Sequence, residues 1–265
     1  MGMKDIKLSI SNIAWNAEKD QPVYDYMQKA GLSGLEIAPT RLFPEKPYEK
    51  KAEAKAYSQR LNEKYSLSIC SMQSIWYGQN EKIFGTEEER AVLLDYTKQA
   101  IVFAEAVGAG NLVFGCPKNR VIGEKDDKVS AVDFFRELGD YAAEHGTVLA
   151  MEANPVIYGT NFLNRTQEAI DFIKEVGSKG FKLNLDYGTI IYNEESIEDL
   201  VSYIHLINHV HISEPNLKLI EQRDGHKALM QMLKDAGYDR YVSIEMGKRD
   251  DIKDVYRTID YLTTL

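Results

Sequence analysis

The chain alternates short apolar runs, typical of β-strands, with longer stretches in which apolar residues recur every three or four positions. The strand-like runs are residues 8–15, 34–39, 68–75, 111–116, 148–154, 181–188, 207–213 and 241–247. The helical stretches are residues 22–30, 47–65, 87–107, 131–145, 166–176, 197–206, 226–236 and 252–262. Because the two spacings separate strands from amphipathic helices, we predict eight consecutive strand–helix units.

The ends of the predicted helices carry the residues that favour such ends. Thr86 precedes three glutamates, as expected of an N-cap followed by an acidic first turn. Five helical runs are followed by a glycine, which is the residue that most readily ends a helix in the left-handed conformation. These glycines are Gly31, Gly108, Gly146, Gly177 and Gly237.

Strict strand–helix alternation requires parallel strands joined by crossover helices. Eight units within 265 residues predict a closed (β/α)8 TIM barrel, with residues 1–265 forming one domain. The alternative is a doubly wound open sheet, which usually has a glycine-rich turn after its first strand. No such turn follows residues 8–15, so we favour the barrel.

The composition is that of a soluble globular protein, with 44% hydrophobic and 28% charged residues. A net charge of −9 without a basic cluster argues against a nucleic-acid partner. No apolar stretch reaches the length of a membrane span, and Met1–Lys7 lacks the apolar run of a signal peptide. The two cysteines, Cys70 and Cys116, cannot form a disulfide framework. We therefore expect a cytoplasmic protein.

Each of the last four predicted strands carries a side chain that can bind a metal near its carboxyl end: Glu152, Asp186, His211 and Glu245. In a barrel these ends meet at the face that holds the active site. Each residue alone has an ordinary explanation, such as a helix cap or a packed core histidine. Three converging carboxylates, however, repel one another unless a cation balances them. We predict one divalent ion, with manganese as first choice and magnesium, cobalt or zinc as alternatives.

Further candidates lie at the predicted mouth of the barrel. Substrate contacts are expected from Glu36, Gln73, His209, Trp15, Lys118 and Arg120. Trp15 is a candidate wall for the nonpolar face of a sugar, with packing on a loop as the alternative. Lys118 and Arg120 are candidate contacts for a phosphate or carboxylate, with surface solubility as the alternative. His209 shares the inward face with His211, and is interpreted either as a supporting or substrate-side group or as a packed core histidine.

At these residues the sequence resembles the xylose isomerase-like barrel superfamily, in its branch of sugar phosphate isomerases and epimerases. The segments that carry the resemblance are Glu36-Ile-Ala-Pro-Thr40, Met151-Glu-Ala-Asn-Pro155, Tyr158-Gly-Thr-Asn-Phe162, Asn184-Leu-Asp186, His209-Val-His211 and Ser243-Ile-Glu-Met246. The resemblance to ketose 3-epimerases implies that Glu152, Asp186, His211 and Glu245 bind the metal. It also implies that the two glutamates form the acid/base pair and that Asn154 and Tyr158 lie at the substrate.

Three positions depart from the pattern of those epimerases. Tyr158 stands where they have a second glutamate, Thr189 where they have a histidine, and Leu217 where they have an arginine. In the relatives all three positions contact the substrate. The resemblance therefore supports metal chemistry and leaves the substrate open.

The function implied is a metal-dependent isomerase or epimerase of a sugar or sugar phosphate. Glu152 and Glu245 would pass a proton through a cis-enediolate that the metal stabilises. The relatives are often homo-oligomers. Two alternatives stay open: a dehydratase of a keto-inositol-type substrate, and a barrel that binds a sugar without turning it over. A DNA repair endonuclease with three zinc ions needs more histidines than the five present, together with a basic surface.

Overall fold

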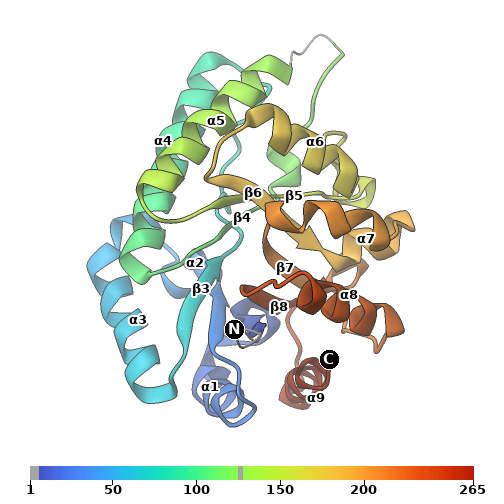
Figure 1. Ribbon diagram of the computed structural model, residues 1–265. Coiled ribbons are helices and arrows are strands. Elements are labelled where there is room, and N and C mark those ends of the chain that lie inside the picture. The colour runs from blue at the N-terminus through green and yellow to red at the C-terminus, as the bar shows by residue number, and fades with distance from the viewer. Residues whose placement is uncertain (1–5, 125–127) are drawn as a thin grey trace.

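Eight parallel strands close into a barrel in the computed structural model, which describes residues 6–124 and 128–265 (Figure 1). The strands are β1 (Lys7–Ser11), β2 (Gly34–Ile37), β3 (Ser68–Met72), β4 (Leu112–Phe114), β5 (Leu149–Glu152), β6 (Phe181–Asp186), β7 (Ile207–Ser213) and β8 (Tyr241–Glu245). Each strand pairs with the next one along the chain, and β8 pairs with β1. The predicted (β/α)8 barrel is confirmed.

Helices surround the strands and follow the predicted order (Figure 1). The α-helices are α1 (Asp20–Lys29), α2 (Pro39–Leu42), α3 (Lys51–Tyr65), α4 (Glu87–Val107), α5 (Lys128–Glu144), α6 (Thr166–Val176), α7 (Tyr187–Asn193), α8 (Asp224–Asp235) and α9 (Ile252–Thr263). The 3-10 helices are η1 (Asn12–Ala14), η2 (Ala17–Lys19), η3 (Pro47–Glu49), η4 (Pro117–Asn119), η5 (Val156–Tyr158), η6 (Glu198–Leu206) and η7 (Pro215–Leu217). The helix expected over residues 197–206 is thus a 3-10 helix.

The residues predicted to begin and end helices do so in the structure. The Thr86 hydroxyl accepts a hydrogen bond from the N–H of Glu89, and the Glu89 carboxylate accepts one from the N–H of Thr86, which completes a capping box at the start of α4. All five glycines predicted to follow helices have φ between +68° and +83°. They end their helices in the conformation that glycine adopts without steric cost.

Several strands end earlier than the apolar runs suggest. The run 8–15 leaves the sheet after Ser11, and the run 181–188 leaves it after Asp186. The next residues stay buried: Trp15 is 2% exposed and Tyr187 is 7% exposed. Apolar character therefore reports burial, and it does not mark where the backbone leaves the sheet.

Aromatic side chains fill the layer between β4–β6 and the helices outside them. Phe135 of α5 is fully buried, with ring centroids 4.8 Å from Phe114 and 5.0 Å from Phe181. It also packs edge-on against Phe134 and Phe172. This cluster holds α5 and α6 onto the side of the barrel that presents Glu152.

Replacing Phe135 with alanine is expected to lower the free energy of unfolding by about 3–5 kcal/mol, because it leaves a cavity among four rings. Urea unfolding followed by circular dichroism measures the change. Val129→Ala, at a side chain on the same helix that is 57% exposed, is the matched control and should change stability by less than about 0.5 kcal/mol. Equal stability of the two variants would contradict this account of the core.

The structure bears on only part of what the sequence predicts about the location of the protein. Within the described ranges, no helix combines the length and the apolar character needed to cross a bilayer. The expectation of no signal peptide rests mainly on residues 1–5, which lie outside the described residues. Cys70 and Cys116 are both free thiols.

Candidate metal centre

The four predicted metal ligands lie together at the carboxyl ends of β5 to β8. Each of Glu152, Asp186, His211 and Glu245 offers one ligand atom, and these atoms all lie within 4.8 Å of one another. The sheet register places two of the four level with each other, because Asp186 pairs with His211 across β6 and β7. Glu152 pairs with Asn184 and Glu245 with Ser213, so these two side chains reach the cluster from other levels of the sheet.

His211 is the centre of this cluster. Its side chain is fully buried, and its Nδ1 lies 3.1 Å from Glu152 Oε1 and 3.3 Å from Glu245 Oε2. Its Nε2 lies 3.0 Å from Glu36 Oε2 on the other side of the ring. A metal-binding histidine usually donates its second ring N–H to a carboxylate, which fixes the ring and the tautomer. This arrangement directs Nδ1 of His211 toward the cluster.

Glu36 lies beneath the site instead of at its mouth. Its carboxylate is fully buried between His211 and His209, whose Nε2 is 3.2 Å from Glu36 Oε2. Gln73 Nε2 donates to Ser11 Oγ at 2.7 Å and lies 3.4 Å from Glu36 Oε1. Burial alone would raise the pKa of Glu36, but the charge of His211 and hydrogen bonds from both histidines hold it well below its ordinary value. Glu36 is therefore an ionised partner that orients His211.

Replacing Glu36 with glutamine is expected to weaken binding of a divalent ion by about 10- to 100-fold, the range seen when the partner of a metal-binding histidine is removed. Isothermal titration with Mn2+ measures this directly. Glu105→Gln, at an exposed carboxylate that contacts His145, is the control and should bind the metal as the wild type does. Unchanged affinity in the Glu36 variant would contradict the orienting role.

Asp186 is held by its neighbours on β6, α7 and β7. Its Oδ2 accepts hydrogen bonds of 2.8 Å from the N–H and from the hydroxyl of Thr189, and its Oδ1 accepts one from the Ser213 hydroxyl. The Ser213 oxygen also accepts from the N–H of Gly188, where a β-carbon would lie only 2.6 Å from that oxygen. Thr189 therefore orients a predicted ligand from a buried position and does not line the cavity described below.

Glu152 is positioned by two amides. Its Oε1 accepts from Asn184 Nδ2 at 2.7 Å, and its Oε2 accepts from Asn154 Nδ2 at 3.0 Å. Arg120 in turn donates to Asn154 Oδ1 at 2.8 Å and to the backbone oxygen of Glu152 at 2.9 Å. This network fixes the carboxylate in the wall of the barrel mouth.

The charges of the cluster favour a cation. Burial and the nearby charge of Glu152 raise the pKa of Asp186 to about 6, while burial raises that of Glu245 to about 7 although His211 opposes the shift. Burial would lower the pKa of His211, but the surrounding carboxylates, Glu36 foremost, raise it well above its ordinary value. Donor atoms around a six-coordinate ion lie roughly 3 to 4 Å apart. The distances and the excess of carboxylates therefore fit a hard or borderline divalent ion.

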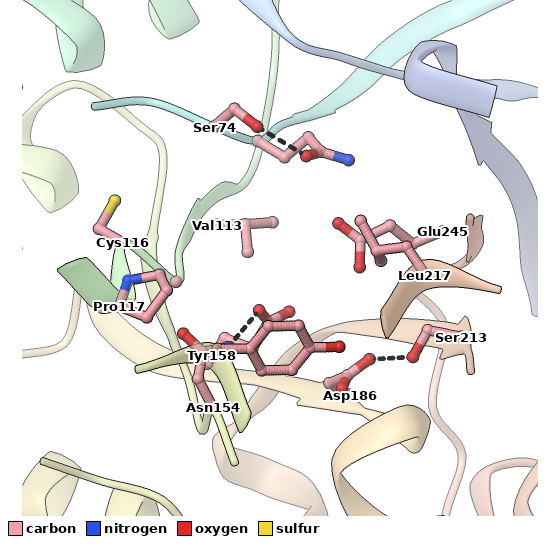
Figure 2. Close-up of a pocket in the computed structure, with 13 residues that line it drawn as sticks. Ser74, Val113, Cys116, Pro117, Asn154, Tyr158, Asp186, Ser213, Leu217 and Glu245 are labelled. Atoms are coloured by element: carbon pink, nitrogen blue, oxygen red, sulfur yellow. Dashed lines mark hydrogen bonds between the residues drawn. The ribbon is translucent and has the colours of Figure 1, made fainter. Parts of the chain in front are cut away.

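A cavity of about 190 Å³ opens above the cluster at the carboxyl end of the barrel (Figure 2). Its lining residues are Gln73, Ser74, Val113, Gly115, Cys116, Pro117, Glu152, Asn154, Tyr158, Asp186, Ser213, Leu217 and Glu245. Figure 2 shows Cys116 and Pro117 on the side of the cavity away from Leu217 and Glu245. Three predicted ligands and three predicted substrate contacts (Gln73, Asn154 and Tyr158) thus border one cavity.

The structure places the other predicted substrate contacts outside the lining of this cavity. Trp15 is buried and donates to Asp20 at 2.8 Å, so it packs beside α1 and forms no cavity wall. Arg120 is fully buried on the network around Glu152, and Lys118 is exposed but does not line the cavity. Glu36 and His209 lie beneath the metal ligands, also away from the lining.

Sequence reasoning missed several residues that support or line the site. Asn184 and Ser213 hold Glu152 and Asp186, and strand alternation could have found them, because each lies two positions from a predicted ligand on the same strand. Ser74, Val113 and Cys116 line the cavity from the ends of β3 and β4. Nothing in their residue types indicates that position.

The family is decided by a match along most of the chain. The sequence model described as "Xylose isomerase-like TIM barrel" matches residues 24–265. The chain belongs to this family. As a member of the xylose isomerase-like barrels, it carries all four predicted ligands within the matched residues.

Individual relatives of this xylose isomerase-like barrel are sugar epimerases. A D-psicose 3-epimerase from Enterocloster bolteae is 34% identical over 94 residues, which cover 35% of this chain and 31% of that enzyme. The fold is similar to 3-keto-D-glucoside 4-epimerase, YcjR, from E. coli (TM-score 0.77, 22% identity, 98% and 99% of the two chains). It is also similar to D-psicose 3-epimerase from Clostridium cellulolyticum H10 (TM-score 0.76, 19% identity, 98% and 97%). At these identities the structural likeness is one of fold, and the curated relative is matched over about a third of its length.

Proposed function

We propose that this protein is a metal-dependent isomerase or epimerase of a small carbohydrate. The observation that carries the proposal is the convergence of Glu152, Asp186, His211 and Glu245, three of which border a cavity at the catalytic face of the barrel. The epimerase relatives support the choice of reaction. A divalent ion held by these four side chains would stabilise the negative charge that develops on the substrate's oxygens when a neighbouring proton leaves.

Glu152 and Glu245 are the groups we assign to proton transfer. They come from β5 and β8, and each lies within 3.3 Å of His211 Nδ1. Both carboxylates border the cavity, so one can remove a proton from a bound carbon chain while the other returns it. Asn184 and Asn154 hold Glu152 in place for this transfer.

The finer parts of this assignment remain predictions. We propose manganese as the ion, because three carboxylates and one imidazole suit a hard or borderline metal. We also propose a cytoplasmic enzyme of one domain, with a carbohydrate substrate and neither nucleic acid nor membrane as partner. A homo-oligomer is expected from the resemblance alone.

Proton exchange in D2O tests the reaction. The protein is loaded with Mn2+, incubated with the ketohexoses D-psicose, D-fructose, D-tagatose and D-sorbose or with a keto-inositol, and followed by NMR. Deuterium incorporation together with formation of a new isomer is the expected result. Loss of water from the keto-inositol would instead identify the dehydratase alternative. Binding of a sugar without any exchange would identify the non-catalytic one.

A further inference from the structure

Arg120 carries a positive charge into the protein interior without a direct ion pair. Its side chain is fully buried, and burial lowers its pKa only to about 10, so the guanidinium is charged at neutral pH. No carboxylate of the described residues forms an ion pair with it, and its Nε is buried without a hydrogen-bond partner among those residues. Because a buried charge is costly unless its surroundings compensate it, the compensation has to come from the groups around the guanidinium.

The hydrogen bonds of Arg120 go to neutral acceptors beside the Glu152 carboxylate. Its Nη2 donates to Asn154 Oδ1 at 2.8 Å and to the backbone oxygen of Glu152 at 2.9 Å. Its Nη1 lies 2.9 Å from Met151 Sδ. A guanidinium is best matched by a carboxylate, which it binds through two parallel bonds. Here its donors instead hold the strand end that carries Glu152 and the amide that contacts it.

Asn154 links this charge to the Glu152 carboxylate. Its Oδ1 accepts from Arg120, and its Nδ2 donates to Glu152 Oε2 at 3.0 Å. A side-chain amide has one acceptor end and one donor end, so the reversed amide would turn its NH2 group toward the guanidinium and its oxygen toward the carboxylate. Arg120 therefore fixes which end of Asn154 faces Glu152. A cation on the amide oxygen also polarises the N–H that Glu152 accepts.

This relay is built into the wall of the cavity. Asn154 borders the cavity (Figure 2), as does Glu152, whereas Arg120 does not. A β-carbon at Gly115 would lie 3.2 Å from Glu152 Oε2 and 3.4 Å from Asn154 Oδ1, so the end of β4 packs directly against this pair. The Thr160 hydroxyl donates to the backbone oxygen of Arg120 at 3.0 Å, which ties the loop after β4 to the loop after β5. Arg120 therefore reaches the site through Asn154 and the backbone of Glu152, without contacting the cavity itself.

We propose that Arg120 is a positioning residue of the metal centre, which acts through Asn154 to hold the Glu152 carboxylate in its working orientation. The proposal rests on the proposed function and adds a residue to its machinery. It also distinguishes the two amides that hold Glu152. The Asn184 oxygen is buried without a hydrogen-bond partner among the described residues, whereas the Asn154 oxygen is held by a charge.

A double-mutant cycle tests the proposal. Arg120→Met removes the charge and its donors, Asn154→Ala removes the relay, and a third variant carries both changes. We expect Arg120→Met to lower kcat for deuterium exchange by about 10- to 100-fold and to change KM by less than about threefold, because Arg120 does not line the cavity. The double variant should match Asn154→Ala within about threefold, since Arg120 acts through that amide. Lys118→Met, at an exposed cation on the same loop, is the control and should keep the kcat and KM of the wild type.

Isothermal titration with Mn2+ on the same proteins gives a readout that does not depend on turnover. Arg120→Met should weaken Mn2+ binding by about tenfold or more, again with no further loss in the double variant. If Arg120→Met does not fold, Arg120→Lys takes its place in the cycle, because lysine keeps the charge but not the forked donor geometry. Its smaller loss should likewise vanish when Asn154 is already alanine.

The outcomes separate this proposal from the proposed function. A loss of kcat or of Mn2+ affinity that disappears in the Asn154→Ala background supports the positioning role. Losses that multiply in the double variant overturn it and leave the isomerase standing, as does an Arg120 variant that melts at a lower temperature but keeps both kcat and Mn2+ affinity. A wild type without exchange on any sugar would count against the isomerase, and the Mn2+ cycle alone then decides the role of Arg120. A wild type that binds no Mn2+ would overturn both.

Discussion

Replacing Glu152 or Glu245 with glutamine is expected to reduce kcat/KM for the sugar substrate by at least about a thousandfold. Glutamine preserves the shape of the side chain but can neither accept the substrate's proton nor supply charge to a cation. Loss of a general acid or base alone costs about 10²- to 10⁴-fold, and each glutamate is also a proposed metal ligand. Deuterium exchange with metal at saturation measures the loss, and a melting curve shows that the variant is folded.

The matched control is Glu221→Gln. Glu221 lies on the loop after β7, has a side chain 72% exposed and contacts Arg223 outside the cavity. Its replacement should leave kcat/KM unchanged within about twofold, as expected for a surface substitution. Wild-type activity in either the Glu152 or the Glu245 variant would contradict the acid/base assignment.

The stabilisation conferred by a bound divalent ion is expected to grow as the pH rises from about 5 to 7.5. In the metal-free protein the pKa values of Asp186 and Glu245 are raised to about 6 and about 7, from ordinary values of 3.8 and 4.5. Between these values the folded state binds more protons than the unfolded state, so its free energy of unfolding falls as the pH rises, by about 1.4 kcal/mol per unit of pKa shift. His211 adds to the fall, because its raised pKa stabilises the folded state only while it is protonated.

A bound ion offsets this loss of stability, because it binds ionised carboxylates and a neutral imidazole, and these forms become more abundant as the pH rises. Melting temperatures at pH 5, 6, 7 and 7.5, with EDTA or with excess Mn2+, measure the difference. We expect the difference in melting temperature between the Mn2+ and EDTA samples to grow by several degrees from pH 5 to pH 7.5. A Glu245→Gln variant should lose part of this pH dependence, because one of the shifted groups is absent. A difference in melting temperature that stays constant or shrinks as the pH rises would contradict the cation site.

The barrel could be predicted because its pattern is repeated eight times. Each strand is buried on both faces and each helix on one, so the two kinds of apolar spacing stay distinct along the whole chain. The limits of single strands could not be predicted in the same way. Tyr187 begins α7 directly after Asp186, yet it is as buried as a strand residue, since the short helix packs onto the end of the barrel.

The convergence of the four predicted ligands could be predicted because buried carboxylates are costly, and three of them and one histidine occur near the ends of four successive strands. The residues that line the cavity could not be predicted in this way, because sequence does not tell whether a polar side chain points into the mouth of the barrel or into the layer behind it. Arg120 shows the difficulty: a guanidinium on a loop after a strand is usually exposed, but here it is fully buried among the backbone and amides around Glu152. Glu36 and His209 lie deeper than predicted for a related reason. Inward-facing strand residues occupy successive layers of the barrel, and sequence does not tell which layer a residue belongs to.

The hydrogen bond between the Tyr158 hydroxyl and the N–H of Asn216 ties Tyr158 to the residue before Leu217. Positions 158 and 217 are two of the three at which the sequence resemblance implies a departure from the ketose 3-epimerases. Tyr158 anchors the turn that presents Leu217, so a change at one position alters the setting of the other. Adaptation to a different sugar should therefore proceed by coupled substitutions. A combinatorial library over positions 158 and 217 would show strong epistasis, with the best pairs absent from either single-site library.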